Sequence, residues 1–85
     1  MKKELYECLL GMFQDEGHRH FHSLPDGLLE EALEVQEATT REELLSELGD
    51  VLWYVTTLAR QNGFSLSDVM TENYHKLERR AAFGK

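Results

Sequence analysis

The 85-residue sequence has little of what marks exported, membrane-spanning or disulfide-rich proteins. Cys8 is its only cysteine, so no internal disulfide can form, and we expect a reducing, cytoplasmic compartment with this thiol as a plain core residue. No apolar run approaches the roughly 18 residues that cross a bilayer, which argues against a membrane partner. The apolar part of the basic start, MKKELYECLL, is interrupted by Glu4 and Glu7, so we also expect no export signal.

Basic residues are scarce as well. The chain has 9 Lys and Arg against 16 Asp and Glu, which gives a net charge of -7. Duplex binding depends on clustered Lys and Arg that meet phosphates, so this balance argues against nucleic acid as a partner. A free nucleotide is not excluded, because divalent cations can lie between acidic side chains and a polyphosphate.

The chain is also short. At 85 residues and 9.9 kDa it has the length of one domain, which we assign to residues 1–85. A core of this size is marginal by itself, so we expect further copies of the chain to complete it.

Apolar residues recur at helical spacing in four segments, and no segment has the alternation of a strand. We predict helices over residues 3–16, 23–37, 40–62 and 65–80, and we expect residues 81–85 to fray. The fold class is therefore all-α, as a four-helix bundle that oligomerisation completes.

Helix starts and core stripes support this assignment. Capping residues precede three helices, as the pairs Ser23 with Asp26, Thr40 with Glu43, and Ser65 with Asp68. The predicted core stripes are Leu5, Cys8, Leu9, Met12 and Phe13 in the first helix, Leu44, Leu48, Val51, Leu52, Val55, Leu58 and Ala59 in the third, and Leu66, Val69, Met70 and Leu77 in the fourth.

Three alternate histidines, His18, His20 and His22, lie between the first two predicted helices. In an extended backbone they would face one way, which admits a zinc site. Structural zinc sites usually recruit Cys or distant His ligands as well, so we interpret the segment as a connector.

Two acidic clusters lie on consecutive predicted helices. Glu30, Glu31 and Glu34 form E-E-x-x-E, twelve residues intervene, and Glu47 and Asp50 form E-x-x-D. Because the members of each cluster are about one turn apart, two antiparallel helices would bring four carboxylates to one place. Like charges so close repel each other unless a cation or raised pKa values relieve them.

Oxygen-only ligands select hard cations, and a site that also holds polyphosphate and water suits Mg²⁺. We therefore favour metal binding over a purely structural acidic face for the four residues Glu31, Glu34, Glu47 and Asp50. A solvated helix face is favoured for Glu37, and Glu43 already serves as a capping residue after Thr40. For Glu30 the sequence does not decide between a role in the site and a place on a solvated helix face.

The fourth helix carries polar residues on and beside its apolar stripe. Asn73 lies on the stripe, where an unpaired amide would cost about 1 to 3 kcal/mol, so it is either hydrogen-bonded internally or aimed at a site. Lys76 and Arg80 are either surface cations that the helix dipole favours or groups that hold distal phosphates. Tyr54 shares the acidic side of the third helix and, with His22, is a candidate for a base pocket.

The sequence resembles the MazG-like nucleotide pyrophosphohydrolases of the all-α NTP pyrophosphatase superfamily. The matching stretches are LLEEALEVQEA, ELGDVLWYVTTLARQNGFSLSDV and ENYHKLERR, which cover most of residues 28–80. The resemblance implies that the Mg²⁺ ligands, with Mn²⁺ as a substitute, are Glu31, Glu34, Glu47 and Asp50. It also implies that Glu30 is the leading acid and that phosphates contact Asn73, Lys76 and Arg80.

The same resemblance implies hydrolysis of a nucleoside triphosphate between its α and β phosphates, which yields a monophosphate and pyrophosphate. It further implies dimers or tetramers of a compact helical bundle, and a role in removing unwanted nucleotides or adjusting dNTP pools. Two alternatives stay open. One is phosphoribosyl-ATP pyrophosphohydrolase of histidine biosynthesis, which shares the fold, and the other is a non-catalytic helical module that binds a nucleotide or a protein.

Overall fold

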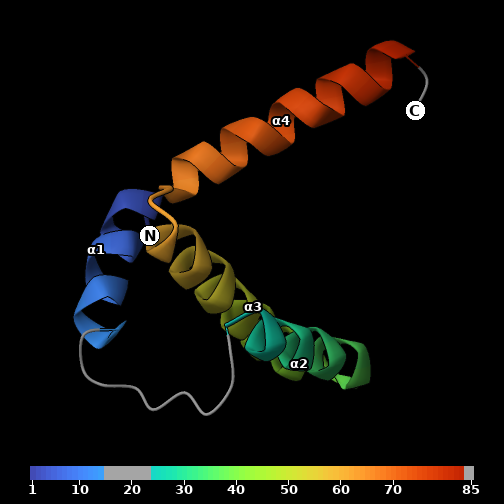
Figure 1. Ribbon diagram of the computed structural model, residues 1–85. Helices are drawn as coiled ribbons and strands as arrows, with labels where there is room; N and C mark the ends of the chain where they lie inside the picture. Colours follow the sequence, from blue (N-terminus) through green and yellow to red (C-terminus); the bar gives the residue numbers. More distant parts are fainter. Residues whose placement is uncertain (15–23, 84–85) are drawn as a thin grey trace.

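The computed structural model describes residues 1–14 and 24–83, and in these ranges it contains helices and no strand (Figure 1). This confirms the all-α prediction. No helix in the described ranges is both long enough and apolar enough to cross a membrane. The histidine segment and the predicted cap Ser23 lie outside the described residues. The helices are α1 (Lys3–Gln14), α2 (Leu24–Glu37), α3 (Arg41–Gln61) and α4 (Leu66–Phe83).

Helices α2 and α3 form an antiparallel pair that makes the most extensive helix–helix packing in the described chain (Figure 1). The link between them consists of residues 38–40, and its last residue, Thr40, forms a capping box that starts α3. The Glu43 backbone N–H donates to Thr40 Oγ1 at 3.0 Å, and the Thr40 N–H donates to Glu43 Oε1 at 3.3 Å. The predicted capping role of Glu43 is therefore confirmed.

The junction between α3 and α4 is fixed by local hydrogen bonds. Gly63 has a φ of +82°, a left-handed conformation that favours glycine, and the next N–H, of Phe64, donates to the carbonyl of Ala59 at 2.9 Å. Ser65 and Asp68 then cap α4 reciprocally, with N–H to oxygen distances of 2.9 and 3.0 Å. The predicted cap of α4 is confirmed.

Helix α4 projects away from the α2/α3 pair (Figure 1). Within the described chain, α4 contacts α1 and α3 but has no contact with α2, and every residue from Met70 to Phe83 is exposed. The helix continues through Phe83, so the expectation that residues 81–83 would fray is wrong. The four helices consequently leave one side of the α2/α3 pair uncovered.

Helix α1 packs with a different side from the predicted one. Leu10 is buried and Tyr6 is half-buried, whereas Leu5, Cys8 and Leu9 are exposed. The expectation that Cys8 is a core residue is therefore wrong for this chain. The reason is that the side of α1 with Tyr6 and Leu10 faces α3 and the start of α4, and this choice depends on contacts distant in sequence.

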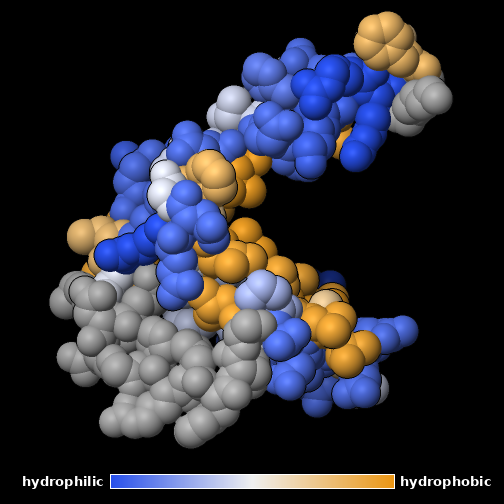
Figure 2. All heavy atoms as spheres, viewed as in Figure 1, coloured by the Kyte–Doolittle hydropathy of each residue, from blue (hydrophilic) through white to orange (hydrophobic). Residues whose placement is uncertain are grey.

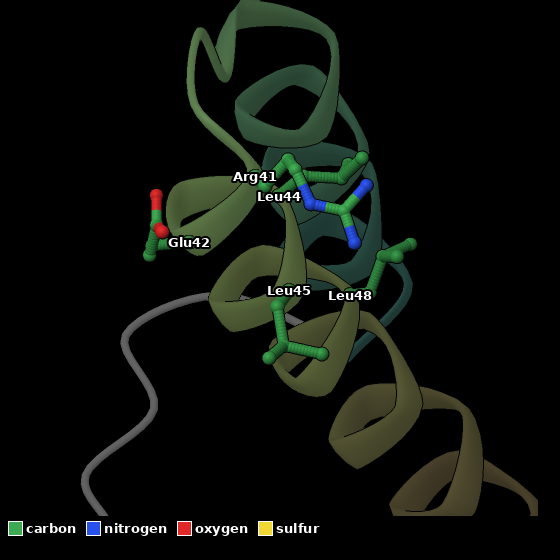
Figure 3. A pocket seen from close by; sticks show the side chains of 5 residues that line it. All are labelled: Arg41, Glu42, Leu44, Leu45 and Leu48. Carbon is green, nitrogen blue, oxygen red and sulfur yellow. The ribbon is translucent and has the colours of Figure 1, made fainter.

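The predicted core stripe of α3 is partly exposed, while Val51, Val55 and Leu58 are half-buried. Ala59 is buried, but the exposed fractions of Leu44, Leu48 and Leu52 are 40%, 49% and 40%. Figure 2 shows hydrophobic side chains gathered on the concave side of the molecule, between α4 and the α2/α3 pair. Leu44, Leu45 and Leu48 line one hollow at the start of α3 (Figure 3), and Leu28, Val55 and Leu58 line another near its end.

Candidate metal centre

The antiparallel pair brings three carboxylates from two helices together. Glu31 and Glu34 are one turn apart on α2, and Glu47 projects from α3 to meet them. One carboxylate oxygen from each of the three residues lies within 4.8 Å of the other two. The structure thus assembles most of the acidic set that the sequence spacing predicts.

Asp50 joins this group from the next turn of α3. Its charge contributes to the raised pKa values of both Glu31 and Glu47, so it lies near these two carboxyls. We call Glu31, Glu34, Glu47 and Asp50 together the acidic cluster.

The electrostatics of the acidic cluster are unfavourable when its members are ionised. Burial, followed by the charges of Glu34 and Asp50, raises the pKa of Glu31 to about 7. Burial and the same two neighbours also raise the pKa of the Glu47 carboxyl. Both shifts mean that the folded chain holds protons there more tightly than an exposed glutamate does.

Two buried oxygens of the cluster have no hydrogen-bond donor. Glu31 Oε1 and Glu47 Oε1 are shielded from solvent and have no partner in the described structure. A buried acceptor without a donor costs about 1 to 3 kcal/mol, and more when it is charged. A divalent cation would satisfy both oxygens, and an all-carboxylate donor set suits a hard ion such as Mg²⁺. The residues present therefore fit a Mg²⁺ site.

Tyr54 lies beside the acidic cluster, as its position on α3 predicts. Burial raises the pKa of its hydroxyl, and the negative charges of Glu31 and Glu30 raise it further. The Tyr54 ring also stacks edge-on against Trp53, with a centroid distance of 4.9 Å. Glu30 itself is exposed on α2, and it is not one of the three residues whose carboxylate oxygens lie within 4.8 Å of one another.

Gly27 is a residue that the sequence analysis missed. It is buried in the first half of α2, and a Cβ atom there would come within 2.8 Å of the Tyr54 hydroxyl oxygen and closer still to the ring. Only a glycine leaves room for the ring at this distance. A glycine inside a predicted helix was the available signal, because glycine disfavours helix interiors.

Tyr6 of α1 is a second residue that the sequence analysis missed. It is half-buried, and burial, together with the charge of Asp50, raises the pKa of its hydroxyl. Helix α1 packs on α3, the helix that carries Asp50, which agrees with this effect. No local pattern could have indicated this contact, because it joins residues 44 positions apart in sequence.

The predicted phosphate-binding residues lie elsewhere in this chain. Asn73, Lys76 and Arg80 are all exposed on α4, which has no contact with α2 in the described residues. Asn73 and Lys76 line a hollow together with Phe64 and Val69. The expectation that Asn73 lies on a packed apolar stripe is therefore wrong for the single chain. Within the described chain, these three residues are also not brought to the acidic cluster. The other base-pocket candidate, His22, lies outside the described residues.

Comparison with known proteins gives one family and one partial relative. The family model described as "MazG nucleotide pyrophosphohydrolase domain" matches residues 19–82. The chain is also 50% identical over 40 residues to the "Gene 37 protein" of Mycobacterium phage L5. That match covers 47% of this chain and 35% of the phage protein, so it spans about a third of that relative. No solved structure matches the chain.

Proposed function

The chain belongs to the MazG nucleotide pyrophosphohydrolase family, and on this premise we propose that it hydrolyses nucleoside triphosphates in a Mg²⁺-dependent reaction. The products would be a nucleoside monophosphate and pyrophosphate, for ribo- or deoxyribonucleotides. The observation that carries this proposal is the acidic cluster, in which two buried carboxylate oxygens lack a donor.

Glu31, Glu34, Glu47 and Asp50 would hold the metal, with Mn²⁺ as a substitute for Mg²⁺. When bound, such an ion offsets charge on the phosphates and lowers the pKa of a coordinated water. One glutamate of this cluster, or the adjacent Glu30, would accept the proton that an attacking water loses at the α-phosphorus. The carboxylates of the cluster already lie together in the metal-free chain, because α2 and α3 carry them on facing sides. Metal binding would therefore need little rearrangement of these side chains.

Other residues would position the nucleotide. We propose that Asn73, Lys76 and Arg80 contact the phosphates, since their donors can neutralise charge on the leaving pyrophosphate. Within one chain α4 does not reach the α2 side of the acidic cluster, so this role would require a further copy of the chain to bring α4 there. We assign the base pocket to Tyr54 and His22. The Tyr54 ring, close enough to the acidic cluster for its charges to raise the pKa of the hydroxyl, would offer an aromatic surface to a base.

We further propose that residues 1–85 act as one domain in a homo-dimer or tetramer, in the cytoplasm and without nucleic acid or membrane partners. The biological role would be nucleotide-pool house-cleaning. The net charge of -7 argues against a nucleic acid partner, because binding to a nucleic acid backbone relies on clustered Lys and Arg.

A substrate screen tests the proposal. The purified full chain is incubated with each NTP and dNTP and with phosphoribosyl-ATP, with Mg²⁺ or with EDTA, and both products are quantified. Monophosphate and pyrophosphate in equal amounts, formed with Mg²⁺ only, are the expected result. Glu47→Gln serves as the inactive control, and Glu42→Gln, which is exposed and lines the hollow of Leu44 and Leu45 instead of the acidic one, as the active control. Activity on phosphoribosyl-ATP alone would reassign the function, and no product from a folded chain would refute hydrolysis.

A further inference from the structure

The acidic cluster and the contact between Gly27 and Tyr54 share one register of the antiparallel α2/α3 pair (Figure 1). Along α2 the steps from position 27 are four and then three residues, and along α3 the same steps run backwards from position 54. In each facing pair the two residue numbers therefore have the same total. The facing pairs, in order, are Gly27 with Tyr54, Glu31 with Asp50, and Glu34 with Glu47.

The directions of the side chains agree with this register. Helical side chains lean toward the N-terminus of their helix, so Glu31 leans back toward Gly27 on α2. On α3, Tyr54 leans back toward Asp50 in the same way. The electrostatics agree as well, because burial and then the charge of Glu31 raise the pKa of the Tyr54 hydroxyl. The contact between Gly27 and Tyr54 is thus the direct neighbour of the pair formed by Glu31 and Asp50.

The packing at Gly27 leaves no space for a side chain. A Cβ atom there would come within 2.8 Å of the Tyr54 hydroxyl oxygen and closer still to the ring, whereas real Cβ atoms essentially never approach within 3.0 Å. Movement of the ring would disturb its edge-on contact with Trp53, at a centroid distance of 4.9 Å. The clash would be relieved by a wider separation of α2 and α3 or by movement of the ring toward the neighbouring pair. Either change would spread that pair apart.

The two ends of the acidic cluster differ in what lies against them. The end near Gly27 meets the ring of Tyr54, which is a rigid body. The other end opens into a hollow that is lined by Ala38 and by glutamates, which are Glu34, Glu37, Glu43 and Glu47. The depth of the ring against α2, which position 27 controls, is therefore what fixes the closed end of the cluster.

We propose that Gly27 is a positioning residue of the metal centre. By admitting the Tyr54 ring at this depth, it sets the spacing of the neighbouring Glu31 and Asp50 carboxylates, and this spacing selects the cation. Mg²⁺ demands oxygen ligands at about 2.0 to 2.1 Å, whereas Ca²⁺ takes them at about 2.3 to 2.6 Å in a looser arrangement. A narrow site therefore favours Mg²⁺. The inference rests on the metal-binding part of the proposed function and adds the residue that keeps the site narrow.

Competition between cations tests the proposal without any nucleotide. The full chain is loaded with Mn²⁺, free Mn²⁺ is counted by electron paramagnetic resonance, and Mg²⁺ or Ca²⁺ is titrated in. The measured quantity is the ratio of the Mg²⁺ affinity to the Ca²⁺ affinity. A partly unfolded variant loses both apparent affinities by the same factor, so a loss of stability alone leaves this ratio unchanged.

Gly27→Ala should lower the affinity ratio by about fivefold or more, because a wider site suits Ca²⁺ better. Gly49→Ala is the matched control and should keep the wild-type ratio, since a Cβ at this helical glycine meets nothing within 4 Å. Trp53, the only tryptophan of the chain, reports on the adjacent Tyr54 ring. Its emission spectrum should change in Gly27→Ala and not in Gly49→Ala. An unchanged ratio or an unchanged spectrum in Gly27→Ala would overturn the proposal.

Two variants of Tyr54 decide the matter if Gly27→Ala does not fold. Tyr54→Phe keeps the ring and should keep the affinity ratio. Tyr54→Ala removes the ring, so that the neighbouring carboxylates are no longer held at a fixed spacing, and should lower the ratio by about fivefold or more. Equal ratios in the two variants would contradict the role of the ring against Gly27.

The outcomes also separate this inference from the proposed hydrolysis. A wild-type chain that binds no cation would remove the metal centre and refute both. Cation binding with a ratio that does not depend on position 27 would refute the role of Gly27 alone. A ratio that depends on Gly27, in a chain that hydrolyses no nucleotide, would support this inference and refute only the hydrolysis.

Discussion

Glu7 Oε2 accepts a hydrogen bond from the backbone N–H of Leu66 at 2.6 Å, across 59 positions of sequence. The carboxylate thereby satisfies one of the free N–H groups at the start of α4 and lies where the helix dipole favours a negative charge. This single bond ties α1 to α4 and helps to set the direction in which α4 projects.

Replacing Glu7 with Ala should destabilise the chain by about 1 to 3 kcal/mol, because the Leu66 N–H would be left without its acceptor in a partly buried place. Urea unfolding followed by circular dichroism measures the change. Glu4→Ala is the matched control, since Glu4 is exposed on the same helix and pairs only with its neighbour Lys3. Its cost should stay below about 0.5 kcal/mol. Equal losses for both variants would mean that the bond to Leu66 contributes nothing.

Glu47→Gln and Asp50→Asn should abolish Mg²⁺ binding while leaving the metal-free chain as stable as the wild type or more so. Both changes remove a negative charge from the acidic cluster and so reduce repulsion. Thermal unfolding with and without Mg²⁺ separates the two effects. The wild type should gain stability with Mg²⁺ by mass action, and the variants should not. A Mg²⁺ response that survives both substitutions would support the interpretation of a solvated acidic face.

The stability of the metal-free chain should fall as the pH rises from about 4.5 to about 7. The pKa of Glu31 is about 7 in the folded chain and 4.5 as an isolated group, so in this range the folded state binds more protons than the unfolded state. The stabilising contribution is complete below the lower value and lost above the higher one. After allowance for partial solvent exposure we expect a loss of about 1 to 2 kcal/mol.

Denaturation at several pH values in EDTA measures this loss, and Glu31→Gln should flatten the profile. Mg²⁺ binding should show the opposite trend and strengthen between about pH 6 and pH 8, since a proton must leave the cluster. Titration calorimetry in buffers of different ionisation enthalpy would detect the released proton. A pH-independent affinity would contradict the shifted pKa of Glu31.

Two glycines within helices should respond in opposite ways to alanine. Gly27→Ala would drive a methyl group into the Tyr54 ring, and we expect a loss of about 1 to 3 kcal/mol. Gly49→Ala meets nothing within 4 Å and should stabilise α3 by up to about 1 kcal/mol. Chemical denaturation compares the two variants. Adding Tyr54→Ala to Gly27→Ala should recover part of the loss, and no recovery would indicate that the ring is not the obstacle.

Much of the local structure was predictable from the sequence. All four helices begin within one residue of the predicted positions, and the caps at Thr40 and Ser65 form as expected. The meeting of Glu31, Glu34 and Glu47 was predictable too, because residues one turn apart share a helix side and a short link makes the two helices antiparallel.

The packing partners of each helix were not predictable in the same way. Hydrophobic spacing placed Cys8 and Leu9 in the core, yet α1 turns Tyr6 and Leu10 inward. Spacing also marked Leu44 and Leu48 as core, and they stay open. A periodic pattern shows that a helix has an apolar side, but it does not show which element covers that side.

The sequence by itself determined the helices, their caps and the pairing of acids within each cluster, because these depend on residues within a few positions of one another. Only the tertiary structure decided that Tyr54 lies on Gly27, that Tyr6 approaches Asp50, and that α4 projects from the chain. Those features depend on contacts between segments that are distant in sequence, such as the hydrogen bond from the Leu66 N–H to Glu7, and no local pattern encodes such contacts.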